Sequence, residues 1–513
     1  MLQKYNSYKI IFIISLLCQI LLLLYHMDIK AGLYVDEVYS YSQSNSPYGL
    51  LFPPNIFNKI QNYDIWKKWV TGQIFKDYIT VSPGNEFNYS NVCDNQKMYS
   101  HPPLYYYVLH SICSCFTGEF SKWFGLSLNL IAFIIVQFLL FHDSKLITNS
   151  NKYSLFICLF FGFSLAAIDN FTFIGPNSLT TIFNLLLLYY YIKILNDKNN
   201  YKLFIAIGLI LVFGLMTHYL FFLYATLMLL TFTILECSLK NYKVLYYCYF
   251  SNLCGFLIAY LIFPSMGNQL LTSLFMKEVT FDIGQFIPGI GWLAYYIRKC
   301  FCIPVPYFFY LAILTLIAFI TTISWLIINK YYEKSNKNKI LLLIIPLIVL
   351  YALISFFANY NYLDNSYYKK IFFSFYPILS IALIAIIKRT RIPFILSLLL
   401  IFSTISPIFC NYLIITDKGE QKSFLKNSNI IFYTNSMEYI QEAVPLLASC
   451  KNVYLFPYAT NKTNNIEIPP LTDGQTFLLI PSNETFTDLK YTKLFTTAIS
   501  TKKVDVYDVT NIK

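Results

Sequence analysis

The sequence consists largely of apolar blocks of about 15 to 25 residues with few charges, the length at which a helix crosses the hydrocarbon layer of a membrane. Of the 513 residues, 57% are hydrophobic and 12% are charged, whereas soluble domains carry roughly 25% charged residues. This composition excludes a soluble enzyme, a disordered chain and an ordinary nucleic-acid-binding protein. It predicts a polytopic membrane protein that is all-α within the membrane.

The blocks predict about eleven transmembrane helices. The first block follows Lys4 and Lys9, and no small-residue cleavage site comes after it. It is therefore predicted to be a retained span whose N-terminus lies in the cytoplasm. In order, the predicted spans are Ile10–Tyr25, Phe124–Phe141, Tyr153–Phe173, Leu179–Ile194, Leu203–Thr217, Tyr219–Leu235, Val244–Phe263, Val305–Ile328, Ile340–Ala358, Ile371–Ile387 and Ile392–Ile415.

The net charge of +12 follows this topology. Positive side chains gather in cytoplasmic loops of membrane proteins, and the outside connections at 170–177 and around His218 carry no Lys or Arg. The pattern therefore predicts that the long loop 26–122 and the C-terminus lie outside. The composition resembles that of an AT-rich bacterium, so the plasma membrane is expected, with a eukaryotic endomembrane as the alternative. The loops assigned to the cytoplasm hold Lys145, Lys152, Lys193, Lys198, Lys202, Lys240, Lys243, Lys330, Lys334, Lys337, Lys339, Lys388, Arg389 and Arg391.

Two segments of the long loop are predicted to lie at the membrane surface. The apolar block Leu104–Phe116 is too short to span, and counting it as a span would place the later lysines outside. The segment Asn58–Thr80 collects Trp66, Trp69 and apolar residues on one helical side, which predicts an amphipathic interfacial helix. A packed loop helix is the alternative.

The composition changes after the last span. Residues 429–433, 452–456 and 475–480 are strand-like runs, and residues 436–449 have a helical pattern. Residues 417–513 are therefore predicted to form a small external α/β domain, after a membrane domain over residues 1–416.

Two adjacent carboxylates, Asp36 and Glu37, follow the first span. Carboxylates at a membrane boundary are costly to desolvate unless they are used or paired. Neighbouring residues point in different directions, so one of the two is expected to face any given site. A general base that removes a proton from an acceptor hydroxyl is one reading, and a solvated acidic pair is the other.

A second cluster runs from Tyr99 to Tyr107 and contains His101, Pro102 and Pro103 before the short apolar block. The paired prolines end any regular structure and so determine where His101 lies. A histidine at a helix entrance can cap the helix, bind a phosphate or bind a metal. No acidic residue and no second histidine stand in the motif, and the cysteines show no metal-ligand spacing, so no metal or other cofactor is indicated.

Together these features resemble the GT-C superfamily of membrane glycosyltransferases, in the branch of the protein O-mannosyltransferases and lipid A aminoarabinose transferases. The resemblance is carried by Asp36-Glu37 after the first helix, the long external loop, and the segment from His101 to Tyr106. Phe120-Ser121-Lys122-Trp123, Thr217-His218-Tyr219 and Tyr368-Lys369-Lys370 look similar as well.

The resemblance implies a polyprenyl-phosphate-linked sugar as donor and an external hydroxyl on a protein, lipid or cell-wall glycan as acceptor. By that resemblance Asp36 would be the base of an inverting transfer, and Glu37 would orient Asp36 or the acceptor. A lipid phosphate is a good leaving group and needs only cations or donors to hold its charge. The candidates for that role are His101, Tyr105, Lys369 and Lys370, although the two lysines could equally be snorkelling anchors.

One segment departs from the family pattern. Before the fourth span many relatives carry an Asp or an Arg-Tyr motif, and here Gly175-Pro176-Asn177 stands in that place. Asn177 cannot ionise but can donate hydrogen bonds, so Asn177 and His218 are possible donor-site residues, with a structural role favoured for His218. The departure keeps an inactive cell-wall-binding scaffold open as an alternative. A flippase or transporter of lipid-linked saccharide is a second alternative, because it would also be polytopic and basic inside.

Overall fold

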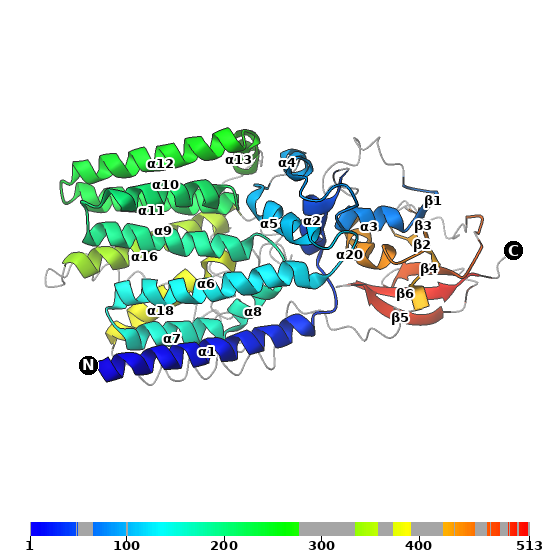
Figure 1. Ribbon diagram of the computed structural model, residues 1–513, viewed down its shortest axis with the longest axis horizontal. Helices are drawn as coiled ribbons and strands as arrows, with labels where there is room; N and C mark the ends of the chain where they lie inside the picture. Colours follow the sequence, from blue (N-terminus) through cyan, green and yellow to red (C-terminus); the bar gives the residue numbers. More distant parts are fainter. Residues whose placement is uncertain are drawn as a thin grey trace. The chain divides into compact units, whose positions relative to one another are not determined.

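A computed structural model provides the structure of the protein (Figure 1). Two predicted spans, Val305–Ile328 and Ile392–Ile415, lie outside the residues it describes. The described residues are 2–47, 49, 65–98, 101–275, 334–357, 373–390, 424–434, 437–456, 469–471, 473–482, 491, 493–499 and 502–510.

Contacts within the chain divide it into two units. The first unit comprises Met1–His26, Ser100–Tyr105 and Leu126–Leu413, and the second comprises Met27–Tyr99, Tyr106–Gly125 and Ile414–Lys513. Most of the long loop thus belongs with the C-terminal segment. Strand pairing between residues 69–71 and 452–454 joins these two segments, which lie far apart in the sequence.

Helices running alongside one another make up the first unit (Figure 1). Five helices of the described chain are long and apolar enough to cross a membrane, namely α1, α6, α9, α11 and α12, and the pair α7 and α8, bent by 60°, would be a sixth. The protein is therefore a multi-pass membrane protein. The elements are α1 (Leu2–Asp28), α6 (Lys122–Thr148), α7 (Asn151–Gly162), α8 (Leu165–Thr172), α9 (Asn177–Asn196), α10 (Tyr201–Leu215), α11 (Tyr219–Cys237), α12 (Tyr242–Ile262), α13 (Ser265–Phe275), α16 (Lys334–Phe357), η4 (Phe373–Phe375) and α18 (Tyr376–Thr390).

Small residues let α10 and α12 approach closely. A β-carbon added to Gly255 of α12 would lie 2.6 Å from the carbonyl oxygen of Gly208 of α10. The hydroxyl of Ser251 donates a hydrogen bond to the carbonyl of Phe204 across the same contact. Close backbone packing and interhelical hydrogen bonds are the usual means of helix association in lipid, which lacks a hydrophobic driving force between helices.

The second unit combines helices with a six-stranded sheet in the order β1-β3-β2-β4-β6-β5. Its centre is parallel, because β2 pairs with both β3 and β4 in that sense, and the remaining pairs are antiparallel. The elements are α2 (Val35–Asn45), β1 (Trp69–Thr71), α3 (Gln73–Ile79), α4 (Tyr89–Met98), α5 (Leu104–Ser114), β2 (Asn429–Tyr433), α20 (Met437–Leu447), β3 (Asn452–Phe456), β4 (Thr476–Pro481), β5 (Lys493–Ile499) and β6 (Lys502–Asp508).

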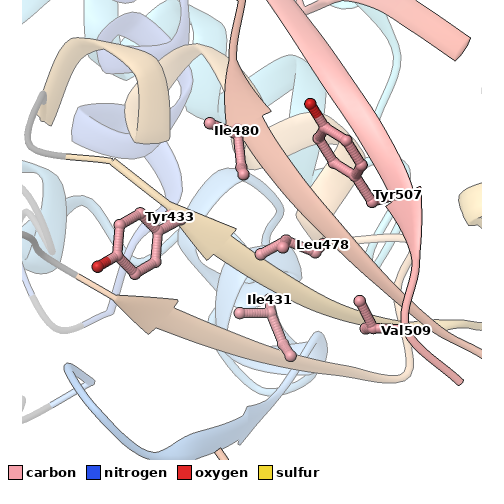
Figure 2. Close-up of a cluster of buried hydrophobic side chains, with 6 residues drawn as sticks. All are labelled: Ile431, Tyr433, Leu478, Ile480, Tyr507 and Val509. Carbon is pink, nitrogen blue, oxygen red and sulfur yellow. The ribbon is translucent and has the colours of Figure 1, made fainter. Parts of the chain in front are cut away.

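Both faces of this sheet bury apolar side chains. One face carries the cluster in Figure 2, formed by Ile431, Tyr433, Leu478, Ile480, Tyr507 and Val509. The alternate residues of the same strands, among them Ile430, Phe432, Val453 and Leu455, are also fully buried. β2 and β4 are buried on both faces and read as continuous apolar runs, whereas β3 buries alternate residues. These three strands and the intervening helix α20 appear where the sequence predicts them.

The amphipathic helix predicted over Asn58–Thr80 is wrong over the described residues 65–72, and only residues 73–79 are helical. Residues 69–71 form β1, whose Trp69 lies opposite Tyr454 of β3, and α3 begins only at Gln73. Lys67 has a φ of 54°, which ends any regular helix at that point. The tryptophans that suggested a membrane-facing helix side instead lie at the edge of the sheet. The sequence does not predict this, because the partner strand lies too far along the chain to leave a local signal.

Helix α5 confirms the short helix predicted from Leu104, and it buries a histidine. His110 is 2% exposed, and its Nδ1 lies 3.4 Å from Oδ1 of Asn45 at the end of α2. Burial lowers the pKa of His110 below its usual value, since desolvation disfavours the charged imidazolium.

Acid is therefore expected to destabilise the second unit through His110. The unfolded chain binds a proton more readily than the folded chain, so this contribution to stability is fully present above a pH of about 6.5 and falls as the pH drops below it. Thermal unfolding of the full-length protein in detergent, followed from pH 8 to pH 5, measures the effect. His110→Gln should flatten the pH dependence, and an equally steep dependence in that variant would contradict the assignment.

Candidate functional site

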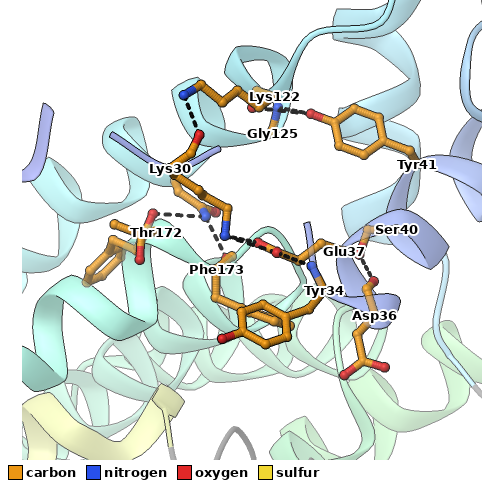
Figure 3. A network of polar contacts seen from close by, with 12 residues as sticks. Lys30, Tyr34, Asp36, Glu37, Ser40, Tyr41, Lys122, Gly125, Thr172 and Phe173 are labelled. Atoms are coloured by element: carbon orange, nitrogen blue, oxygen red, sulfur yellow. Dashed lines mark hydrogen bonds and ion pairs between the residues drawn. The ribbon is translucent and has the colours of Figure 1, made fainter. Parts of the chain in front are cut away.

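A fully buried ion pair stands at the start of the long loop (Figure 3). The Nζ atom of Lys30 lies 2.9 Å from Oε1 and 3.0 Å from Oε2 of Glu37, and the side chains are 1% and 0% exposed. The same ammonium group lies 5.7 Å from the centre of the Tyr34 ring. Because both carboxylate oxygens face this lysine, the charge of Glu37 is neutralised inside the protein.

Glu37 also holds the beginning of α2. Its Oε2 accepts a hydrogen bond of 2.8 Å from the backbone N–H of Tyr34, and the backbone N–H of Glu37 donates to the carbonyl of Tyr34 at 2.9 Å. A carboxylate at the third helical position that reaches back to the N-cap N–H satisfies a donor that the helix itself leaves open. Glu37 is therefore committed to the ion pair and to the helix start.

Asp36 is oriented differently. Figure 3 shows its carboxylate pointing away from the Lys30–Glu37 pair, and the side chain is half-buried. Its backbone carbonyl accepts a hydrogen bond of 3.0 Å from Oγ of Ser40, one turn further along α2. The two neighbouring carboxylates therefore point in different directions, and Asp36 is the one that is directed away from the internal pair.

Sequence reasoning missed the groups that hold this turn in place. The Nζ atom of Lys122 donates to the carbonyls of Asp28 and Lys30, at 2.7 Å and 2.6 Å. The hydroxyl of the buried Tyr41 donates to the carbonyl of Ser121 at 2.8 Å and accepts from the N–H of Gly125 at 3.0 Å. Lys30 directly follows an apolar span, a position typical of an interfacial anchor. The sequence therefore gives no sign that Lys30 has a buried partner.

Burial, and after it the Glu37 carboxylate, raises the pKa of Tyr34 well above its usual range. Tyr34 therefore stays a neutral phenol at physiological pH. A neutral Tyr34 beside the Lys30–Glu37 pair leaves the charge of that pair balanced, so no further counter-ion is required there.

In the first unit, the segment that carries His101 lies at the end of α10. The backbone N–H of Leu104 donates to the carbonyl of Met216 at 2.8 Å, and the rings of His101 and His218 lie 6.2 Å apart between centroids. Nδ1 of His218 accepts a hydrogen bond of 3.0 Å from the N–H of Leu220, which caps α11. The ring of His218 is thus bound to the start of its own helix, whereas His101 is half-buried and Tyr105 is fully buried.

Asn177 begins α9 and is 7% exposed. The chain before it is held by Asn129 of α6, whose Nδ2 donates to the carbonyls of Phe171 and Phe173 at 3.1 Å and 2.7 Å. The Oδ1 atom of Asn129 accepts from Oγ of Ser178 at 2.6 Å. Asn129, an uncharged residue, therefore organises the turn before Asn177. Many relatives in the resembled family carry an acid or an Arg-Tyr motif in that turn.

The candidate residues fall into the two units. Asp36 and Glu37 belong to the second unit, and His101, Tyr105, Asn177 and His218 belong to the first. Lys369 and Lys370 lie outside the described residues. Within the described part of the chain, no group of three or more His, Cys, Asp or Glu side chains is placed to hold a metal ion.

The sequence matches no family model and no curated protein. Among solved structures, the chain is similar to ArnT from Cupriavidus metallidurans bound to undecaprenyl phosphate, with 11% identity and a TM-score of 0.42 over 97% of this chain and 98% of that chain. It is similar to the same protein in the apo state, again with 11% identity and a TM-score of 0.42, over 99% of each chain. A likeness of this size assigns no function to any residue of this chain.

Proposed function

We propose that this protein is a glycosyltransferase that moves a sugar from a polyprenyl-phosphate-linked donor to an acceptor hydroxyl on the external face of the membrane. The observation that supports it most is the division of the acidic pair after the first span, where Glu37 is neutralised by Lys30 and the Asp36 carboxylate points away from that pair. A carboxylate directed away from an internal ion pair can accept a proton from a hydroxyl group.

In the proposed reaction Asp36 removes the proton from the acceptor hydroxyl. At the same time the oxygen of that hydroxyl attacks the anomeric carbon of the donor sugar. The bond from that carbon to the phosphate oxygen breaks, and polyprenyl phosphate leaves with the electron pair. A single displacement of this kind inverts the anomeric configuration. The leaving phosphate needs no general acid, so the remaining task of the protein is to hold its negative charge.

His101 is the described candidate for that task. It is half-buried and stands at the entrance of α5, where the contact between Leu104 and Met216 positions its segment. Lys369 and Lys370 are the proposed cationic partners. Tyr105 is fully buried and His218 caps α11, so both are assigned to supporting the shape of this region. Asn177 remains a candidate hydrogen-bond donor to the donor sugar.

The experiment is a release assay with the purified full-length protein in detergent or nanodiscs. The donors are polyprenyl-phosphate sugars with a labelled lipid. Each donor is tested with three classes of acceptor, namely proteins, lipids and cell-wall glycans, and the released polyprenyl phosphate is quantified. The proposal predicts release that depends on one class of acceptor, together with an inverted linkage in the product. Heat-denatured protein provides the control for spontaneous hydrolysis.

The two alternatives give different results in the same preparation. A flippase or transporter of lipid-linked saccharide would move the labelled donor across the bilayer of a proteoliposome without releasing polyprenyl phosphate. An inactive scaffold would bind cell-wall polymer but would neither release nor translocate the donor. Either pattern, obtained across the donor series, would replace the transferase proposal.

A further inference from the structure

The Lys30–Glu37 pair is more elaborate than the capping of a helix requires. A glutamine at position 37 would accept the same hydrogen bond from the N–H of Tyr34 without burying two opposite charges. Here an ammonium and a carboxylate are withdrawn from water at 1% and 0% exposure, and burying ions is costly unless the geometry is tightly held. Such a pair holds the Glu37 side chain in a defined position. Asp36 is the residue next to Glu37 in the same helical turn.

We propose that Lys30 is a positioning residue that acts through Glu37 to fix the first turn of α2 and thereby the direction of the Asp36 carboxylate. This inference rests on the proposed function, in which Asp36 is the base. Lys30 itself faces Glu37 and the Tyr34 ring, so it has no place among the groups that touch the donor.

A short series of hydrogen bonds and ion-pair contacts connects Lys30 with the helical turn that carries Asp36. Both oxygens of Glu37 face Nζ of Lys30, and Oε2 also accepts from the N–H of Tyr34, which fixes where α2 begins. The backbone of Lys30 is in turn held by Lys122, which donates to the carbonyl of Lys30 at 2.6 Å. Asp36 lies between Tyr34 and Glu37, so a shift of this turn moves its carboxylate.

The pair also has an electrostatic effect on Asp36. An uncompensated carboxylate at Glu37 would repel the negative charge of the base and would draw Lys122 or water toward this turn. With Lys30 in place the charge of Glu37 is balanced by a group that is equally buried. Removing both charges at once should therefore disturb Asp36 less than removing Lys30 alone.

The test compares Lys30→Met, Glu37→Gln and the double variant in the full-length protein. Glutamine at position 37 can still accept the hydrogen bond from the N–H of Tyr34. Lys30→Met is expected to lower kcat for polyprenyl phosphate release about 10²-fold with little change in the donor KM, the effect of a misplaced catalytic group. The double variant should recover part of that loss, because it leaves no unpaired buried charge although it also lacks the ion pair.

A second measurement does not depend on turnover. Hydrogen exchange of the amides of residues 33–40 should become faster in Lys30→Met and return toward the wild-type rate in the double variant. The matched control is the exposed pair Lys97 and Asp94, whose side chains are 49% and 57% exposed and whose removal should change neither readout.

Three outcomes would overturn the positioning function. These are unchanged exchange over residues 33–40 in Lys30→Met, a higher donor KM at unchanged kcat, and a double variant no better than the single one. If Lys30→Met does not fold, the double variant and Glu37→Gln carry the comparison. A wild-type protein without any donor turnover would instead refute the proposed function, and the exchange comparison would still decide whether Lys30 positions α2.

Discussion

Asp36→Asn is expected to lower acceptor-dependent release of polyprenyl phosphate by about 10²- to 10⁴-fold, the usual contribution of a general base. The substitution keeps the size of the side chain and removes its ability to take a proton. Because Asp36 is half-buried and Glu37 holds the start of α2, the helix should form as before. Initial rates at saturating donor and acceptor measure the effect, and donor binding should persist because the base does not contact the leaving phosphate.

Asp94→Asn is the matched control for this prediction. Asp94 lies in the same loop, its side chain is 57% exposed, and it forms an exposed ion pair with Lys97 at 2.8 Å. The activity of this variant should equal that of the wild type. Equal turnover in Asp36→Asn and the wild type would exclude Asp36 as the base and would move the search to other acids of the external segments.

Gly72→Ala is expected to open the second unit between the long loop and the C-terminal segment. A β-carbon at position 72 would lie 2.0 Å from the carbonyl oxygen of Cys450 and 2.9 Å from that of Leu447. Both obstacles are backbone atoms, so no side-chain rotation can relieve the overlap. Overpacking costs roughly 1–3 kcal/mol, and one to two kcal/mol raises the open fraction about 5- to 30-fold.

The buried thiol of Cys450 reports this opening directly. Burial raises the pKa of Cys450 to about 12, which keeps the thiol unreactive in the closed state. Maleimide labelling of Cys450, followed by mass spectrometry, should therefore be faster in Gly72→Ala. The exposed neighbour Thr71 supplies the control, since Thr71→Ala should label at the wild-type rate. Equal labelling in Gly72→Ala would show that the loop is not packed on Cys450.

Periodicity and length were sufficient for most elements. Residues 429–433 and 452–456 are predicted as strands and form β2 and β3, because a continuous apolar run and an alternating one are both local properties of a segment. The span predicted over Tyr153–Phe173 is interrupted, since α7 ends at Gly162 and α8 begins at Leu165. Hydropathy averages over such a break and could not reveal it.

The site was predicted in part. Adjacent acids after a first span indicated a base, and the alternation of side-chain directions indicated that only one would serve. The resemblance points to Asp36, but the residues alone do not show that Glu37 is paired, because its partner Lys30 has the position of a helix-end anchor. Trp69 shows the same limit, since its place in an edge strand depends on Tyr454 of β3.

The sequence by itself determined a multi-pass membrane protein with strands and helices after the last span, because hydropathy and side-chain period are properties of each segment alone. The tertiary structure decided the contacts between segments that are distant along the chain. It paired β1 of the long loop with β3, and it directed Glu37 toward Lys30 while Asp36 points elsewhere. Burial and charge compensation decide such contacts, and both depend on which groups meet in space.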